Sequence, residues 1–148
     1  MIVCHLVKSQ ISLICGFLFF IRTKANYSIF ADQFVKSIIM KNEIKSLEEL
    51  QQHIAEKPAV LAYFYNDNCA PCLSLRPKII ELIDNEFPKI ELLFINSIQR
   101  EIPAHYGVYD NPTLLVFFDR KEHVRESKYV SVAQLHNTIE RYYNLMFE

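Results

Sequence analysis

Two hydrophobic patterns alternate along residues 46–147. Continuous apolar runs at residues 59–65 and 90–95 predict strands of a parallel sheet that is covered on both faces. Residues 46–56 and 72–86 instead carry apolar side chains at helical spacing, and Ser46 opens the first helix with a capping-box sequence. The alternation of strands and helices predicts an α/β domain.

The C-terminal third of the chain continues this pattern. Residues 113–118 and 123–128 predict a hairpin, and a last helix begins at Ser131. Its expected buried stripe consists of Val132, Leu135, Ile139, Tyr142 and Tyr143. Pro77 lies inside the predicted helix 72–86 and is expected to kink it.

Composition narrows the possible functions. The 148 residues are 51% hydrophobic, enough for one core with an appendage, and the net charge of −1 gives no electrostatic reason to expect nucleic-acid binding. Only two glycines are present, Gly16 and Gly107, which excludes glycine-rich phosphate and dinucleotide loops. We therefore expect no cofactor, and electrons for any reduction must come from a partner protein.

Residues 1–39 are expected to form an N-terminal extension, and residues 40–148 the domain. The apolar run at 11–21 is too short to span a bilayer, has the length of a signal-peptide core, and lacks a clear cleavage site after it. Three interpretations stay open: a poor signal or membrane anchor, an amphipathic extension, or an upstream stretch that is not translated, because Met40 could start the chain. The compartment depends on this choice.

Cys69-Ala70-Pro71-Cys72 joins the first apolar run to the helix that follows it. Helical geometry holds Cys72 one turn from Cys69, within reach of a disulfide, and the free N–H groups of the helix start favour a thiolate at Cys69. The alternative is half of a zinc site. Because Cys4 and Cys15 lie far upstream and lack the spacing of a second pair, the pattern favours redox chemistry and no metal.

A second motif, Asn111-Pro112-Thr113, opens the apolar strand forty residues later. With the Cys-x-Pro-Cys turn and the segment His105-Tyr106-Gly107-Val108 at matching spacing, residues 46–147 resemble the thioredoxin family. The resemblance implies a thioredoxin fold, with a central mixed sheet of four to five strands flanked by helices. It also implies a cis peptide bond before Pro112.

The same resemblance implies the roles of the site residues. Cys69 would be the exposed nucleophile and Cys72 the shielded resolving thiol. An extended substrate would bind beside them, pairing with the backbone at Asn111. The residues expected to contact this substrate are Asn68, Ala70, Pro71, Asn111 and Pro112.

Several positions depart from the family pattern. Tyr63 stands where the family usually has a buried aspartate, and the usual lysine partner is missing from the next strand, so proton transfer to Cys72 must use Asp67 or, by preference, water. Asn68 replaces the usual tryptophan, and Lys128 falls near a customary glycine, which indicates a more polar and crowded substrate surface. His105 and His123 are interpreted as solvated or capping residues.

These features predict a monomeric, cytoplasmic thiol-disulfide oxidoreductase that reduces protein disulfides and receives electrons from a reductase protein. One alternative is a redox-sensing or substrate-binding module with little turnover, favoured by Tyr63 and Asn68. Another is an exported oxidase or isomerase, or a membrane-anchored form, if residues 1–39 act as a signal or anchor.

Overall fold

A computed structural model describes residues 42–148 of the chain. Within them, five strands form one mixed sheet in the order β1-β3-β2-β4-β5. β1 and β2 run parallel to β3, whereas β4 is antiparallel to β2 and β5. The strands are β1 (Glu43–Ile44), β2 (Ala59–Tyr65), β3 (Glu91–Asn96), β4 (Thr113–Phe118) and β5 (Lys121–Ser127).

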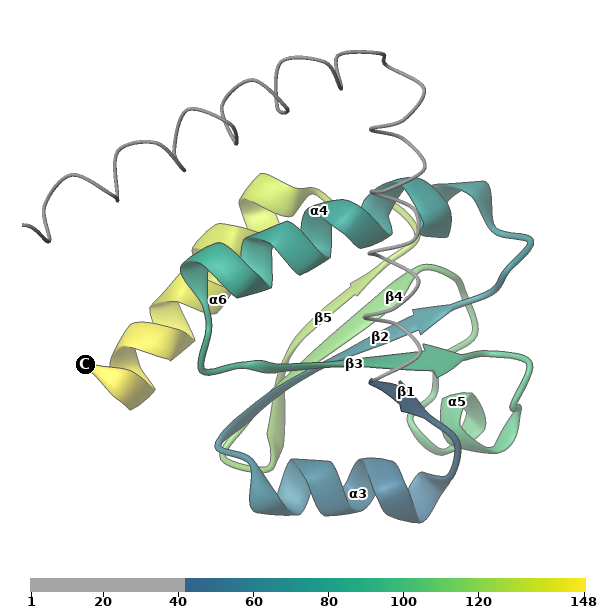
Figure 1. Cartoon of the computed structure of the whole chain (residues 1–148), viewed down its shortest axis with the longest axis horizontal. Coiled ribbons are helices and arrows are strands. Elements are labelled where there is room, and N and C mark those ends of the chain that lie inside the picture. The colour runs from purple at the N-terminus through teal and green to yellow at the C-terminus, as the bar shows by residue number, and fades with distance from the viewer. Residues whose placement is uncertain (1–41) are drawn as a thin grey trace, which may run out of the picture. The chain divides into compact units, whose positions relative to one another are not determined.

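Helices cover both faces of this sheet. Figure 1 shows α4 and α6 on one face and α3 and α5 on the other. They are α3 (Leu47–Glu56), α4 (Ala70–Glu86), α5 (Glu101–His105) and α6 (Val132–Phe147). The architecture confirms the predicted α/β fold with a mixed sheet flanked by helices. The predicted extension, residues 1–39, lies outside the described residues.

Element boundaries differ from the prediction by one or two residues. α4 begins at Ala70 rather than at residue 72, because the Cys69 side chain caps it. β3 lies one residue later than the predicted 90–95. β5 starts two residues early because Asp119 and Arg120, with φ of 47° and 67°, close a two-residue hairpin turn directly after β4. The two-residue strand β1 was not predicted, since it is too short to produce a hydrophobic run.

β2 lies at the centre of the sheet and is buried on both faces. Val60, Ala62 and Phe64 belong to the core cluster that contains Leu50 and Ile54 of α3. The intervening side chains point to the opposite face, since neighbouring residues of a strand alternate. Tyr63 and Tyr65 therefore lie on the face that α4 covers.

The last helix packs through a narrower stripe than predicted. Leu135, Ile139 and Tyr143 are buried, whereas Val132 and Tyr142 are only half-buried. Tyr142 lies at the edge of the sheet, where its ring stacks on Phe118 with centroids 5.7 Å apart. Pro77 lies inside α4 as predicted, and the helix continues past it to Glu86.

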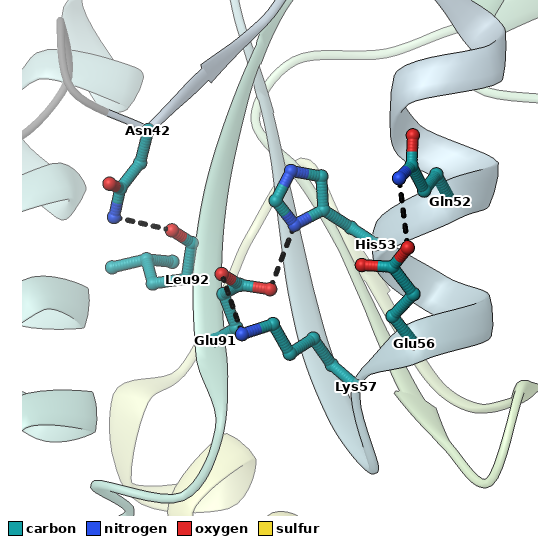
Figure 2. Close-up of polar contacts among 7 residues, drawn as sticks. All are labelled: Asn42, Gln52, His53, Glu56, Lys57, Glu91 and Leu92. Atoms are coloured by element: carbon teal, nitrogen blue, oxygen red, sulfur yellow. Dashed lines mark hydrogen bonds and ion pairs between the residues drawn. The ribbon is translucent and has the colours of Figure 1, made fainter.

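Polar contacts join the end of α3 to the beginning of β3 (Figure 2). The Cys turn follows the other end of the parallel strands. His53 Nδ1 lies 2.9 Å from Glu91 Oε2, and Lys57 Nζ lies 3.8 Å from Glu91 Oε1. On the neighbouring residue of β3, the Leu92 carbonyl accepts a 2.9 Å hydrogen bond from the Asn42 side chain. Within residues 42–148, no helix is long and apolar enough to cross a membrane.

Candidate active site at the Cys69–Cys72 turn

The turn between β2 and α4 is held by its asparagines. The Asn66 side chain accepts a 3.0 Å hydrogen bond from the Asn68 backbone N–H, and its carbonyl accepts one of 3.1 Å from Cys69 N–H. Asp67 Oδ2 accepts a 3.1 Å bond from the Asn96 side chain at the end of β3. These bonds fix where Cys69 stands relative to the ends of β2 and β3.

Cys69 and Cys72 form a disulfide, and their Cα atoms lie 5.2 Å apart. Cys69 is the N-cap of α4, and its Sγ accepts a 3.2 Å hydrogen bond from the backbone N–H of Cys72. Cys69 is partly exposed, whereas Cys72 is fully buried. A thiolate at the N-cap is stabilised by this N–H group and by the helix dipole, so the geometry favours the ionised form of Cys69.

Pro112 lies beside the disulfide turn, and the peptide bond between Asn111 and Pro112 is cis, as the resemblance implied. Pro71 and Pro112 line one groove of about 230 Å³, together with Lys128 and Tyr129. Lys128 has a φ of 63°, donates its N–H to the Pro112 carbonyl at 3.0 Å, and places its ammonium group 3.3 Å from Asp110. A lysine thus occupies a left-handed position at the rim of the groove, where the sequence predicted crowding.

The other predicted substrate-binding residues surround the same turn. Asn68 and Ala70 are exposed on either side of Cys69. Asn111 is held by Ser97, whose hydroxyl donates a 2.7 Å hydrogen bond to its side-chain oxygen. Asn111 also lines a second cavity of about 350 Å³. The structure therefore brings all the predicted site residues to one end of the sheet, while their roles stay predictions.

Tyr63 contacts Cys72 from the neighbouring strand β2. Its side chain is fully buried, and its hydroxyl donates a 2.9 Å hydrogen bond to the Cys72 carbonyl. Burial raises the pKa of Tyr63 well above the ordinary tyrosine value, although the positive charge of Arg76 opposes part of this rise. The hydroxyl therefore stays protonated at neutral pH and serves as a donor, not as a base.

Arg76 was not singled out from the sequence, yet its side chain is 7% exposed inside α4. A signal was present: residue 76 lies four positions after Cys72 and three before Ile79, both of which face the core. A charged residue at a buried helical position is rare and usually has a specific partner. The face that joins α4 to β2 is therefore more polar than the pattern indicated.

Of the remaining polar candidates, Asp67 lies in the turn itself and the two histidines lie on other elements. His105 contacts Gln51 of α3, and His123 packs against Tyr142. Both histidines are exposed, as expected of solvated residues. Asp67 is exposed and bonded to Asn96, as a turn residue. Among residues 42–148, no three histidine, cysteine or acidic side chains are grouped so that they could hold a metal ion.

The upstream cysteines, Cys4 and Cys15, lie outside the described residues. The structure therefore does not test whether they could complete a zinc site with the Cys pair.

Comparison with known proteins agrees with the geometry. Residues 41–141 match the sequence model of the thioredoxin family, and the chain belongs to that family. It is 29% identical over 103 residues to the thioredoxin-like protein YdfQ of Bacillus subtilis, an alignment that covers 69% of this chain and 91% of the relative. It is 34% identical over 74 residues to a thioredoxin of Rickettsia bellii, covering 49% of this chain and 69% of that protein.

A solved structure extends the similarity to three dimensions. The X-ray structure of Fasciola hepatica thioredoxin superimposes with a TM-score of 0.62 at 29% identity, covering 68% of this chain and 97% of the other. The family, the fold and the Cys69–Cys72 disulfide together support thiol-disulfide oxidoreductase chemistry in general terms.

Proposed function

We propose that this protein reduces disulfide bonds in other proteins. The observation that carries the proposal is the asymmetry of the Cys pair. Cys69 is partly exposed at the N-cap of α4, and its sulfur accepts a hydrogen bond from the backbone N–H of Cys72. The side chain of Cys72 is buried. An exposed, stabilised thiolate can attack an external disulfide, while a shielded thiol can attack only its neighbour.

The reaction begins with the dithiol form. The Cys69 thiolate attacks one sulfur of the substrate disulfide, forms a mixed disulfide and releases the other substrate sulfur as a thiolate. Cys72, deprotonated, then attacks Cys69 Sγ, forms the Cys69–Cys72 bond and releases the second substrate thiolate. Two electrons pass to the substrate, and the protein is left as the disulfide. A reductase protein or a small dithiol must return these electrons.

The surface around Cys69 supports a protein substrate. Within the described residues, four of the five exposed large apolar side chains lie at the end of the sheet where β2 leads into the Cys turn: Leu73 (53% exposed), Ile98 (64%), Tyr109 (87%) and Tyr129 (94%). Leu73 lies in the first turn of α4, and Ile98 follows β3. Tyr109 lies shortly before Asn111, and Tyr129 follows β5. Apolar side chains gathered at one end are typical of protein-binding surfaces.

Turnover of insulin disulfides with dithiothreitol tests the proposal. The wild-type protein should accelerate insulin reduction, and Cys69→Ser should abolish the acceleration. Cys72→Ser should accumulate a mixed disulfide with the substrate, because the resolving thiol is missing. A wild-type rate equal to that of dithiothreitol alone would contradict the proposal.

A second function is favoured by the crowded groove. Lys128 and Tyr129 stand at its rim beside Pro112, which supports a redox-sensing or substrate-binding module with little turnover. Such a module would form the mixed disulfide in Cys72→Ser without sustained insulin reduction by the wild type. We place the protein in the cytoplasm as a monomer, and mass spectrometry of its native N-terminus would distinguish this from an exported or anchored form.

A further inference from the structure

Arg76 is a buried cation with few partners. Its side chain is 7% exposed, and neither Nε nor Nη2 has a hydrogen-bond partner in the described part of the chain. No ion pair among residues 42–148 involves it. A buried charge without a counter-ion is costly, so an anion that forms beside Arg76 would be stabilised by it.

The position of Arg76 relates it to Cys72. The two residues are four apart on α4, and both side chains are buried, so they share one face of the helix. The guanidinium carbon lies 4.2 Å from the centroid of the Tyr65 ring, at the end of β2 that leads into the Cys turn. Because helical side chains lean toward the N-terminus, this places the charge beside the first turn of α4.

The acidic groups near this position lie beyond ion-pair distance of Arg76. On β2, burial raises the pKa of both Tyr63 and Tyr65, which therefore stay uncharged at neutral pH. Glu43 of β1 accepts a 3.0 Å hydrogen bond from the Tyr65 hydroxyl, and Asp67 in the turn accepts one from Asn96. Neither carboxylate forms an ion pair with Arg76.

We propose that Arg76 stabilises the thiolate of Cys72 when the disulfide is opened, and so promotes the step in which Cys72 resolves the mixed disulfide. The inference rests on the proposed function for that step. Arg76 acts through its charge and does not accept a proton, because a guanidinium has no acceptor. The proton of Cys72 passes to water, and the thiolate then forms the bond to Cys69 Sγ as the substrate thiolate leaves.

The ionisation of Cys72 can be measured without substrate. Replacing Cys4, Cys15 and Cys69 with serine leaves Cys72 as the single thiol, whose ultraviolet thiolate absorbance is followed against pH. In this background we expect Arg76→Gln to lower the thiolate fraction at pH 7 about tenfold, the effect of one unit charge near a buried group. Arg76→Met, which suits an apolar site, should behave in the same way, and Arg76→Lys should keep part of the effect.

Lys78→Gln is the matched control. Lys78 is an exposed cation on the same helix, two residues farther on, so solvent screens its charge and the thiolate fraction should change by less than about twofold. Equal losses in Arg76→Gln and Lys78→Gln would overturn the proposal, because a general change of net charge would then explain both. An unchanged thiolate fraction in both Arg76→Gln and Arg76→Met would overturn it as well.

Stopped-flow decay of the mixed disulfide supplies the kinetic test. At neutral pH we expect Arg76→Gln to slow the decay by only about threefold, since a thiolate of higher pKa is scarcer but more nucleophilic. The deficit should disappear at alkaline pH, whereas a purely structural defect would persist. If Arg76 shifts the ionisation of Cys72 but the wild type does not reduce insulin, the proposed function fails and the effect of Arg76 on the thiolate stands. If the wild type reduces insulin but the Arg76 variants do not change the ionisation of Cys72, the proposed function stands and this inference fails.

Discussion

Replacing Tyr63 with phenylalanine removes one hydroxyl group from the interface between β2 and α4. That hydroxyl is fully buried and donates a 2.9 Å hydrogen bond to the Cys72 carbonyl. The phenyl ring keeps the packing on Phe94, whose ring centroid lies 5.8 Å away. The substitution therefore tests the hydrogen bond with little change in the packing of the core.

The expected loss follows from the burial of both partners. A buried hydrogen bond contributes about 1 kcal/mol net, and a carbonyl left without its partner costs about 1–3 kcal/mol. Phenylalanine has no hydroxyl group to remove from water, and this offsets part of the lost stabilisation. We therefore expect the free energy of unfolding to fall by about 1 kcal/mol. For a domain of this size, that lowers the thermal midpoint by about 4–8 °C.

Urea denaturation of the oxidised protein, followed by far-ultraviolet circular dichroism, measures this loss. The midpoint should fall by roughly 0.5–1 M without a change in slope. Amide hydrogen exchange should also become faster in the first turn of α4, which contains the Cys72 carbonyl that loses its hydrogen bond. Tyr129→Phe is the control, because Tyr129 is 94% exposed. A Tyr63→Phe protein as stable as the wild type would refute the structural role assigned to the hydroxyl.

Three further predictions follow from the described contacts. Burial raises the pKa of Tyr63 and Tyr65 above the ordinary tyrosine value of about 10, so their contribution to the free energy of unfolding is complete below that pH. Above it, this free energy should fall by up to about 1.4 kcal/mol per pH unit for each tyrosine. Urea titrations at several pH values should show a smaller fall for Tyr63→Phe. Lys128→Gly should relieve the left-handed backbone and open the groove, raising kcat/KM for insulin but not for a small disulfide, and equal changes for both would contradict this. A chain beginning at Met40 should keep the thermal midpoint and activity of the full chain, and a loss of several degrees would show that residues 1–39 stabilise the domain.

The architecture was predictable because its elements have strong local signals. The run at residues 59–65 is apolar at every position, which only a central strand covered on both faces accommodates, and β2 is buried throughout. The capping box at Ser46 marked the start of α3, where its hydroxyl accepts a hydrogen bond from the Glu49 N–H. Spacing alone missed β1, since two residues have no period to detect.

The site was predictable only in part. The Cys pair and Pro112 belong to short motifs, and such motifs survive as patterns in a single sequence. The contacts of Tyr63 with Cys72 and of Arg76 with Tyr65 join α4 to β2 across the core. These contacts depend on the rotation of α4 about its axis and on the direction of each side chain. Apolar spacing shows which face of a helix is buried, but not which residue each side chain on that face contacts.

The charge of Arg76 has consequences for the resolving role that we propose for Cys72. A buried aspartate at position 63, as the family pattern usually has, would accept a proton from the thiol but would repel the resulting thiolate. Here that position holds a neutral hydroxyl donor, and the charged group on the same face is the guanidinium of Arg76. A cation favours the thiolate at equilibrium but cannot take up its proton. Resolution should therefore depend on the thiolate fraction of Cys72 and on water as the proton acceptor, so its rate should rise with pH along a single ionisation, that of Cys72 itself.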